Sequence, residues 1–479
     1  MMNTIVTEKM MPFKELEKKV FDSVCEMGRI LIKTILESYD EQLQETRNKK
    51  ELRCKGTRQT TIKTVMGEVG YSRNVYQTMD EAGHKAWVYL LDQELQMDKI
   101  GFFSTNLAEK IAKVVTDNSY HTTAEIISST CGQSISHGGA WRLVQRIGER
   151  ISGEETARVK EMDATGGKGT KELKLLFEEM DGVWLKMQGK GHKKAPKQEM
   201  KVATIYEGWE DDGGSCSRLL GKTLVAGMER SGEFHAKREA RIRSIYNADE
   251  IGVRVLNGDG GSWIKDPYEP ETVFQLDRFH IRQCIKKKIV PQDVQKQIGQ
   301  LFEEGRYDEM FEYIGIYADS VESSDEKDNN GKKARELYEY LDNNREGLVP
   351  WQKQRNDYPG APEGMVYKNM GVQENQNCTT ITLRMKEGRR RWSRNGANNM
   401  AKLLTCRENK ELVETIGRYT DGTIMAEPVQ EILRTLSAAK APKKDGKGNA
   451  YIDLVNHHMP MLNAMQTNAR KVFRKAFAV

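Results

Sequence analysis

Two segments of the chain each end a largely apolar run in an acidic residue that glycine follows. Asp259 comes after the β-branched run at residues 253–256, and Asp181 comes after the run at residues 175–180. A carboxylate at the end of a buried strand can hold a divalent cation, and small neighbours allow a phosphate backbone to approach closely. The two aspartates therefore predict a metal-dependent phosphoryl-transfer site.

Chemistry of this kind on DNA requires carboxylates from different parts of the fold that converge on two metal ions. One Mg²⁺ (or Mn²⁺) ion would activate water or a DNA 3′-hydroxyl, and the second would stabilise the leaving oxygen. Oxygen ligands suit these ions, and three acids together with substrate phosphates are sufficient. A third acid is therefore expected elsewhere in the chain.

Each aspartate also has an interpretation that involves no chemistry. The dipeptide Asp181-Gly182 is common in hairpin turns. Asp259, which two glycines follow, could equally lie in a tight loop. The pairing of the two aspartates and their placement at predicted strand ends favour the functional interpretation.

A third strand-end aspartate, Asp277, competes with Asp259 for the role of second acid. It follows a predicted strand at residues 272–276 and precedes His280 in an Asp-x-x-His pattern. We expect His280 to orient the site or to contact DNA. His280 and Cys284 are also one helical turn apart and could begin a zinc site, but no second pair of ligands is evident.

The elements around these acids predict a mixed α/β domain. They are strands at residues 174–180, 183–187 and 200–206, a helix at 234–246, and strands at 252–256 and 272–276. Three antiparallel strands followed by helix, strand, helix and strand is the order of a ribonuclease-H-like fold. A charged, helix-prone stretch at residues 290–364 predicts a helical insertion into this domain.

The N-terminal part of the chain predicts a packed helix at residues 13–44, a β-hairpin at 57–76 and then a helix-turn-helix. In the last of these, a turn that contains Gly132 leads into a second helix that begins near Ser136. A DNA reader of this kind places its second helix in the major groove. The outer face of that helix carries His137, Trp141, Arg142, Gln145 and Arg146. Paired amphipathic helices are also common packing units, which is the alternative.

The expected organisation has seven parts. They are an N-terminal helical region (1–50), a small β-hairpin region (51–100), the helix-turn-helix domain (101–160), the first part of the catalytic core (161–290), the helical insertion (291–365), the last part of the core (366–410) and a basic helical C-terminal region (411–479).

The composition of the 479-residue chain is that of a globular protein, with 38% hydrophobic and 30% charged residues. No apolar run approaches the roughly 20 residues that span a bilayer, and no signal-like segment begins the chain, so we expect no membrane partner and a cytoplasmic location. The seven cysteines lie far apart, without a Cys-x-x-Cys pair, and are expected to be reduced thiols.

Basic residues are clustered although the net charge is only +5. Such clusters suggest a polyanionic partner, whereas the alternative is ordinary solvated surface. Tryptophans 184, 209 and 263 could stack on unpaired bases, although burial in a core is more common. The expected DNA contacts outside the helix-turn-helix are Lys193, Lys194, Arg389, Arg390 and Arg391.

Five ordered motifs carry a resemblance to a known family. They are Met180-Asp181-Gly182-Val183-Trp184, Tyr206-Glu207-Gly208-Trp209, Leu256-Asn257-Gly258-Asp259-Gly260-Gly261-Ser262-Trp263, Phe274-Gln275-Leu276-Asp277-Arg278-Phe279-His280 and Trp392-Ser393-x-x-Gly396-Ala397-x-x-Met400-Ala401. Together they resemble the ISLre-type bacterial insertion-sequence transposases, a family similar to the Mutator-like enzymes with an Asp-Asp-Glu active site. The resemblance covers most of the chain.

The resemblance implies a site and its metal ligands. Asp181 and Asp259 match the first two catalytic acids, and Glu374, in the pattern Gly-x-x-Glu-Asn, matches the third. The chain departs from the family at Val372 and Gln373, where a small or apolar residue is expected. Threonines at 379, 380 and 382 favour strand over helix near Glu374.

The resemblance also implies an activity: a DNA transposase that binds the terminal inverted repeats of its element and joins them to target DNA with two Mg²⁺ or Mn²⁺ ions. Because two ends must be brought together, we expect a homo-oligomer on DNA. The alternatives are a catalytically inactive DNA-binding protein and a structure-specific nuclease of the same fold.

Overall fold

The structure is a computed structural model that describes residues 12–80, 83–95, 103–189, 194–211, 218–265, 272–321 and 329–420. It is a mixed α/β structure that divides into two compact units. The first unit draws its described residues from Met1–Val115, Ser119–Leu143 and Val413–Val479. The second draws them from Thr116–Asn118 and Val144–Leu412.

The first unit begins with a long helix and a small antiparallel sheet. These elements are α1 (Phe13–Thr46), β1 (Arg53–Thr64), β2 (Gly67–Met79), β3 (Lys85–Val88) and the short α2 (Leu90–Glu94), with the strand order β1-β2-β3. Leu36 and Tyr39 of α1 pack with Tyr71 of β2. The predicted helix and hairpin are confirmed, but the helix packs only in part, because Val20 and Val24 in its first half are exposed.

The predicted helix-turn-helix segment contains the helices α3 (Thr105–Val115), α4 (Tyr120–Thr130) and α5 (His137–Thr165). Ser119 caps α4, because its hydroxyl accepts a hydrogen bond from the Thr122 amide at 3.0 Å. Ser136 accepts one from the Gly139 amide at 3.0 Å at the start of α5. The buried face of α5 holds the apolar residues expected there, Ala140, Leu143, Val144, Ile147 and Ile151. The helix continues to Thr165, beyond its predicted extent.

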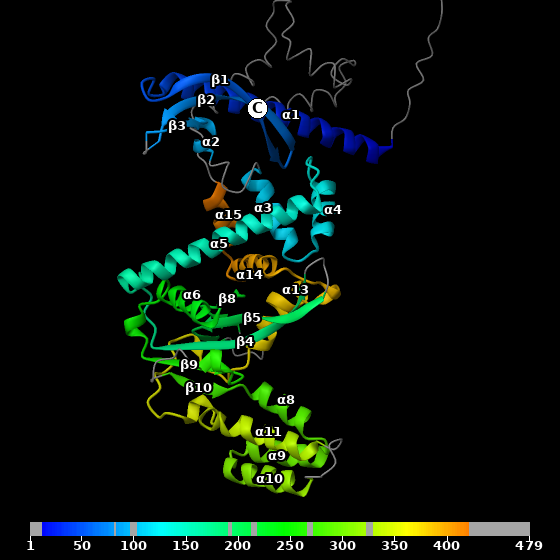
Figure 1. Ribbon diagram of the computed structural model, residues 1–479, viewed down its shortest axis with the longest axis vertical. Coiled ribbons are helices and arrows are strands. Elements are labelled where there is room, and N and C mark those ends of the chain that lie inside the picture. Colours follow the sequence, from blue (N-terminus) through cyan, green and yellow to red (C-terminus); the bar gives the residue numbers. More distant parts are fainter. Residues whose placement is uncertain are drawn as a thin grey trace, which may run out of the picture. The chain divides into compact units, whose positions relative to one another are not determined.

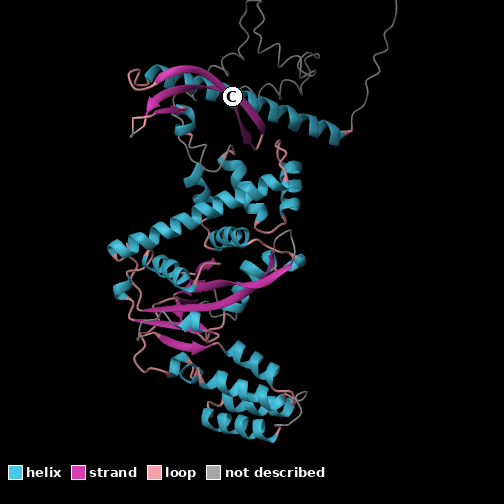
Figure 2. Ribbon diagram, viewed as in Figure 1, coloured by secondary structure: helices cyan, strands magenta, loops and turns pink. Residues whose placement is uncertain are grey.

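The second unit is built on a five-stranded sheet of mixed direction (Figures 1 and 2). Its strands are β4 (Leu175–Gln188), β5 (Lys194–Tyr206), β8 (Thr223–Gly227), β9 (Val253–Gly258) and β10 (Val273–Leu276), in the order β10-β9-β4-β5-β8. β4 and β5 are antiparallel, as are β5 and β8. β9 is parallel to both β4 and β10. The central strand β4 therefore has an antiparallel neighbour on one side and a parallel one on the other.

The sheet corrects one part of the sequence prediction. The segments 174–180 and 183–187 are not two strands but one continuous β4, whose pairing with β5 runs from Phe177 to Gln188. The third antiparallel strand is instead β8, a fully buried five-residue strand that the prediction missed. Local sequence alone suggests a turn at Asp181-Gly182, because it does not reveal the pairing of this segment with β5. β8 was missed because its five residues are all buried, so they do not alternate between apolar and polar.

Both faces of the sheet are covered. On one face, Leu176 and Met180 of β4 pack with Phe234 and Ile242 of α6 (Ser231–Arg243). On the other face, Phe177 packs with aromatic residues around Trp351, near the short strands β6 (Gly208–Glu210), β7 (Leu219–Leu220) and β11 (Met365–Val366). α14 (Arg394–Glu408) contacts β8, where Lys402 Nζ donates to the Ala226 carbonyl at 2.9 Å.

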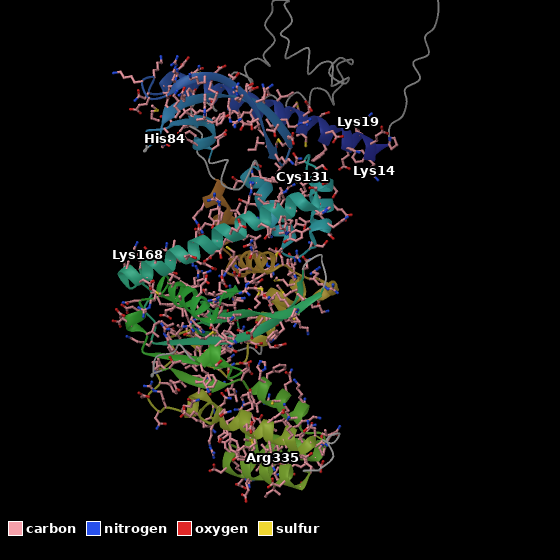
Figure 3. The ribbon with its side chains drawn as sticks, viewed as in Figure 1. Lys14, Lys19, His84, Cys131, Lys168 and Arg335 are labelled. Carbon is pink, nitrogen blue, oxygen red and sulfur yellow. The ribbon has the colours of Figure 1, made fainter. Side chains whose placement is uncertain are left out.

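The helices expected between residues 290 and 364 are observed as a subdomain with its own apolar core. Its helices are α8 (Arg278–Lys288), α9 (Gln292–Glu303), α10 (Tyr307–Ser320) and α11 (Asn330–Asp342), which lie together in Figure 1. Arg335 of α11, labelled in Figure 3, forms an ion pair at 3.1 Å with Asp319 of α10. Trp351 follows in a short 3-10 helix, Trp351–Lys353.

Near the C-terminus, α15 (Leu412–Thr420) ends the part of the chain that the structure describes. The basic helical region predicted for residues 411–479 lies almost wholly outside it. None of the described helices is both long and apolar enough to cross a membrane.

Candidate active site

The strand register brings three aspartates to one edge of the sheet. The pairing of β4 with β9 ends at Met180 and Gly258, and that of β9 with β10 ends at Gly258 and Leu276. The next residues along the three strands are Asp181, Asp259 and Asp277. Because paired residues of adjacent parallel strands lie side by side, these aspartates lie at the same level across the three strands, although β4 itself continues past Asp181 to Gln188.

Asp181 lies inside β4, so the hairpin-turn interpretation of Asp181-Gly182 is wrong. Its Oδ2 accepts a hydrogen bond from Asn377 Nδ2 at 2.8 Å, and its Oδ1 accepts one from the Gly182 amide at 2.7 Å. His280 Nε2 lies 3.7 Å from Oδ1. The carboxylate is mostly buried and is oriented by three groups from different elements.

Asp259 follows β9 directly and combines a strand end with a tight turn. Its Oδ1 accepts a hydrogen bond from the Gly261 amide at 2.9 Å, and Gly260 has a φ of +82°, which favours glycine. The Tyr340 hydroxyl donates to the Asp259 carbonyl at 3.1 Å, which fixes the turn to α11. Burial raises the pKa of Asp259, and the negative charge of Asp181 raises it further, although the Gly261 amide opposes the shift.

Asp277 differs from Asp181 and Asp259 because it caps a helix. It is the N-cap of α8, where its Oδ1 accepts a hydrogen bond from the Phe279 amide at 2.7 Å. Its Oδ2 accepts one from Asn257 Nδ2 at 3.3 Å, and only 5% of the residue is exposed. Asp277 is therefore buried and serves as a helix cap, whereas Asp259 is only partly buried, so the geometry favours Asp259 over Asp277 as the second acid.

His280 lies one turn into α8 and faces the acids. Its interaction with Asp181 raises the pKa of the imidazole to about 9, against the effect of burial, and the nearby Asp277 and Asp259 add to the rise. The ring is therefore a cation at neutral pH that partly offsets the charge of the acids. Within the described ranges, no group of three His, Cys, Asp or Glu side chains is arranged to hold a metal ion, and this includes the possible zinc site at His280 and Cys284.

Glu374 lies in a helix, and none of the described contacts joins its side chain to the aspartates. It belongs to α12 (Gln373–Gln376), which continues through a π-helix, Asn377–Thr382, into α13 (Leu383–Met385). Glu374 is exposed, whereas Asn377, three residues later, contacts Asp181. The threonines that favour strand are accommodated in the π-helical turn, a feature frequent at functional sites.

Glu199 is an acid of this region that the sequence did not reveal. It lies on β5 opposite Trp184, and Trp263 donates a hydrogen bond to it. Burial raises its pKa, and the charges of Asp259 and Asp181 contribute to the rise. A Cβ atom on Gly182 would collide with the Glu199 carboxylate, so the glycine after Asp181 makes room for it. No local signal separates Glu199 from the surrounding charged residues of β5.

Glu179 was also missed. It is fully buried two residues before Asp181 and accepts hydrogen bonds from the start of α12. The only signal for it was the pair Glu178-Glu179 inside an otherwise apolar strand. Burial raises the pKa of Glu179, although amide hydrogen bonds from Gly371 and Val372 and the Tyr206 hydroxyl oppose the rise.

The predicted DNA-reading face of α5 is exposed, with one exception. His137, Trp141, Arg142 and Arg146 are exposed, and 45% of Trp141 is accessible. Gln145 is 8% exposed, and its Oε1 accepts a hydrogen bond from Asn399 Nδ2 at 2.9 Å. Gln145 therefore cannot read DNA from this position, because α14 packs over that side of the helix.

The other predicted DNA contacts have mixed outcomes. Arg391 is exposed, whereas Arg390 donates to the carbonyls of Leu383 and Arg384 and so closes the end of α13. Lys194 begins β5. Lys193 and the side chains of Lys194 and Arg389 lie outside the described part of the structure.

The three tryptophans suggested for base stacking also differ. Trp184 is 53% exposed on β4, three residues beyond Asp181. Trp209 is buried in the aromatic core, and Trp263 is partly buried against Phe234, with ring centroids 5.9 Å apart. Of these, only Trp184 has the exposure that stacking on a base requires.

Comparisons with known proteins place the chain among relatives of similar length. The model of an uncharacterised protein family, UPF0236, matches residues 6–417. A UPF0236 protein from Caldanaerobacter subterraneus subsp. tengcongensis is 23% identical over 407 residues, which cover 83% of this chain and 78% of the relative. A UPF0236 protein in the vanSb 3′ region of Streptococcus gallolyticus is 24% identical over 361 residues, which cover 74% of this chain and 73% of the relative.

Proposed function

We propose that this chain, which belongs to the uncharacterised protein family UPF0236, is a DNA transposase with a ribonuclease-H-like catalytic core. The observation that carries the proposal is the placement of Asp181 and Asp259 directly after the last paired residues of β4 and β9, Met180 and Gly258. The two carboxylates interact closely enough for Asp181 to raise the pKa of Asp259. A partly buried carboxylate whose pKa is raised by a neighbouring like charge is typical of a functional site.

The sheet supports the proposed fold. β4, β5 and β8 are consecutive antiparallel strands, and β9 and β10 follow on the other side of β4 and run parallel to it. This agrees with the ribonuclease-H-like order of three antiparallel strands, helix, strand, helix and strand, with α6 and the short α7 (Ser262–Lys265) as the helices. The motifs that resemble those of ISLre-type transposases include both aspartates.

The names of the relatives are consistent with mobility. The name of the first Caldanaerobacter relative joins eleven locus names for one protein. A gene present at many loci of one genome is what a transposable element leaves behind. This observation favours a transposase over a structure-specific nuclease.

Asp181 and Asp259 offer two carboxylates, which are ligands that Mg²⁺ or Mn²⁺ prefer. Since no third such side chain is grouped with them in the described ranges, substrate phosphates and a third acid would have to complete the set. A pair of these ions, when bound, supplies charge stabilisation for the attacking and leaving oxygens. Asn377 and His280 hold Asp181 in place. Glu374 is proposed as the third acid, since it lies one turn before Asn377 on the same helix.

We further propose that the exposed face of α5, with Trp141, Arg142 and Arg146, contacts the terminal inverted repeats of the element. Cationic side chains neutralise phosphates, and side chains near a helix start can reach base edges. A homo-oligomer would hold the two ends together.

The test is cleavage of terminal-repeat DNA by the purified protein in the presence of Mg²⁺. Asp181→Asn and Asp259→Asn should each lower the rate at least about a thousandfold while the protein stays folded, because each removes a metal ligand. The matched variant Asp277→Asn should keep most of the rate and lose only about 1 kcal/mol of stability as a weakened helix cap.

Full activity of Asp181→Asn and Asp259→Asn would refute the assignment. Loss of activity in Asp277→Asn together with retained activity in Asp259→Asn would exchange their roles. A free 3′-hydroxyl end supplied with a target plasmid separates strand transfer from simple cleavage. Binding without any cleavage would indicate the inactive DNA-binding protein instead.

A further inference from the structure

The start of α12 is attached to the central strand by one buried carboxylate, Glu179. Its oxygens accept hydrogen bonds from the amides of Gly371 (3.0 and 3.1 Å), Val372 (3.2 Å) and Gln373 (3.3 Å). These are the amides at the start of a helix, which have no partner within the helix itself. Glu179 therefore satisfies donors that an apolar side chain would leave buried without hydrogen bonds.

Two further donors hold the carboxylate from the sheet. The Tyr206 hydroxyl of β5 donates to Oε1 at 2.7 Å, and Asn257 Nδ2 of β9 donates to Oε2 at 3.0 Å. An ionised carboxylate has only acceptor positions and no donor, so it suits a site that donor groups surround. The five residues that donate come from β5, β9 and the start of α12, and Glu179 joins them at one point.

The same helix reaches the candidate site one turn later. Asn377 Nδ2 donates to Asp181 Oδ2 at 2.8 Å, and Gln373 Nε2 donates to Asn377 Oδ1 at 2.9 Å. Glu179 and Asp181 are two residues apart on β4 and so lie on the same face of the strand. The helix is thus held to β4 at two successive points, first by Glu179 and then by Asp181.

We propose that Glu179 is a positioning residue of the active site, which fixes the helix carrying Glu374 and Asn377 against the strand carrying Asp181. The inference rests on the proposed function for its catalytic part. Glu179 does not contact the reacting atoms; it acts through the backbone of residues 371–373. The helix start, and with it the distance from Glu374 to the aspartates, depends on this one carboxylate.

Glu178 provides a matched comparison on the same strand. It is as fully buried as Glu179, but it points to the opposite face, where Arg238 lies 3.3 Å and Arg254 3.8 Å away. Glu178 therefore interacts with cations, whereas the described contacts of Glu179 are with amides and a hydroxyl. A Glu→Gln substitution should alter the stability of the protein at either position. Only the substitution at Glu179 should disturb α12, because only Glu179 contacts the start of that helix.

The experiment compares Glu179→Gln with Glu178→Gln in the full chain. The glutamine at 179 brings two donors toward a cluster of donors, so the amides of residues 371–373 should exchange with solvent about tenfold faster or more. Glu178→Gln should leave their exchange within about twofold of the wild type. Hydrogen exchange measured by mass spectrometry reads this without any assay of activity.

The second readout is kinetic. Per folded molecule, Glu179→Gln should lower the rate constant for strand transfer at saturating DNA about a hundredfold, with the Kd for terminal-repeat DNA unchanged. Glu178→Gln should retain the wild-type rate constant. Unchanged exchange at residues 371–373, or an unchanged rate constant in an active enzyme, would overturn the inference.

A wild-type protein with no cleavage activity would refute the proposed function and leave the exchange experiment to decide the role of Glu179. If Glu179→Gln does not fold, Tyr206→Phe replaces it, because that variant removes one donor and keeps the ring that stacks on Phe177 at 5.4 Å. It should give a smaller increase in exchange at the same amides, and no increase would contradict the inference.

Discussion

Two groups of buried charge in the second unit are arranged in opposite ways. The first, which we call the paired cluster, consists of Glu155, Glu229, Lys237 and Lys402. Lys402 Nζ lies 2.8 Å from Glu155 and 2.9 Å from Glu229, and Lys237 Nζ lies 2.7 Å from Glu229. The second group is Asp181 with Asp259, where two acids lie side by side and His280 is the neighbouring cation.

The two groups differ in what offsets the loss of hydration. Burial opposes ionisation of Glu229, but Lys402 and Lys237 overcome it and lower the pKa of this carboxyl to about 2. For Asp259, burial raises the pKa and Asp181 raises it further. The chain therefore completes its own charge balance at the paired cluster and leaves it incomplete at Asp181 and Asp259, where we propose that metal ions bind.

The largest effect should come from breaking the paired cluster. Lys402→Met removes the fully buried ammonium that lies between two carboxylates, and we expect a loss of about 3–5 kcal/mol in the free energy of unfolding. Urea denaturation followed by circular dichroism would measure it. The double variant Lys402→Met/Glu229→Gln should recover part of the loss, and a loss below about 1 kcal/mol in the single variant would contradict the balance described above.

The next largest effect should be a dependence of the unfolding free energy on pH, caused by Glu229. Its folded pKa of about 2 is lower than the ordinary value of 4.5, so its contribution is fully present above pH 4.5 and is lost as the pH falls toward 2. We expect the difference in unfolding free energy between wild type and Glu229→Gln to shrink by on the order of 2–3 kcal/mol across this range. Denaturation at a series of pH values would show it, and a constant difference would disprove it.

The smallest effect on stability should come from Asp181 and Asp259, the pair at the candidate site. Asp259→Asn removes one of two like charges, so the unfolding free energy should change by less than about 1 kcal/mol or should rise. Millimolar Mg²⁺ should raise the Tm of the wild type by about 2 °C and leave that of Asp259→Asn unchanged. A large destabilisation by Asp259→Asn would mean that this pair resembles the paired cluster after all.

Much of the fold could be predicted because its signals are local. The helical spacing at residues 13–44 and the apolar face of α5 depend on neighbours within a few turns, and both are observed. β8 could not be predicted, since a short strand buried on all sides has no alternation. The prediction that Gln145 contacts DNA failed for a related reason. Gln145 lies on the predicted helix, but it is buried against α14, which is far away in the sequence.

The candidate site shows the same division. Asp181 and Asp259 could be found from sequence because each follows an apolar run and precedes a glycine. The sequence could not decide whether Asp277 or Asp259 is the second acid. A catalytic acid at a strand end and a helix N-cap have the same local sequence, and they differ only in the amide that donates a hydrogen bond to the carboxylate. Glu199 and Glu179 carried almost no signal, because their roles come from partners on other strands.

Local sequence patterns predicted most of the strands and helices around the site and singled out Asp181 and Asp259, because hydrophobic period and turn chemistry act between near neighbours; they missed β8 and divided β4 in two. The tertiary structure alone decided which acids stand together. The strand register places Asp181 and Asp259 at the same level, and the first turn of α8 donates a hydrogen bond to Asp277. The contact between Asn377 and Asp181 joins parts of the chain that are distant in sequence. Such contacts depend on how separate elements pack against each other, and a local sequence pattern does not specify that packing.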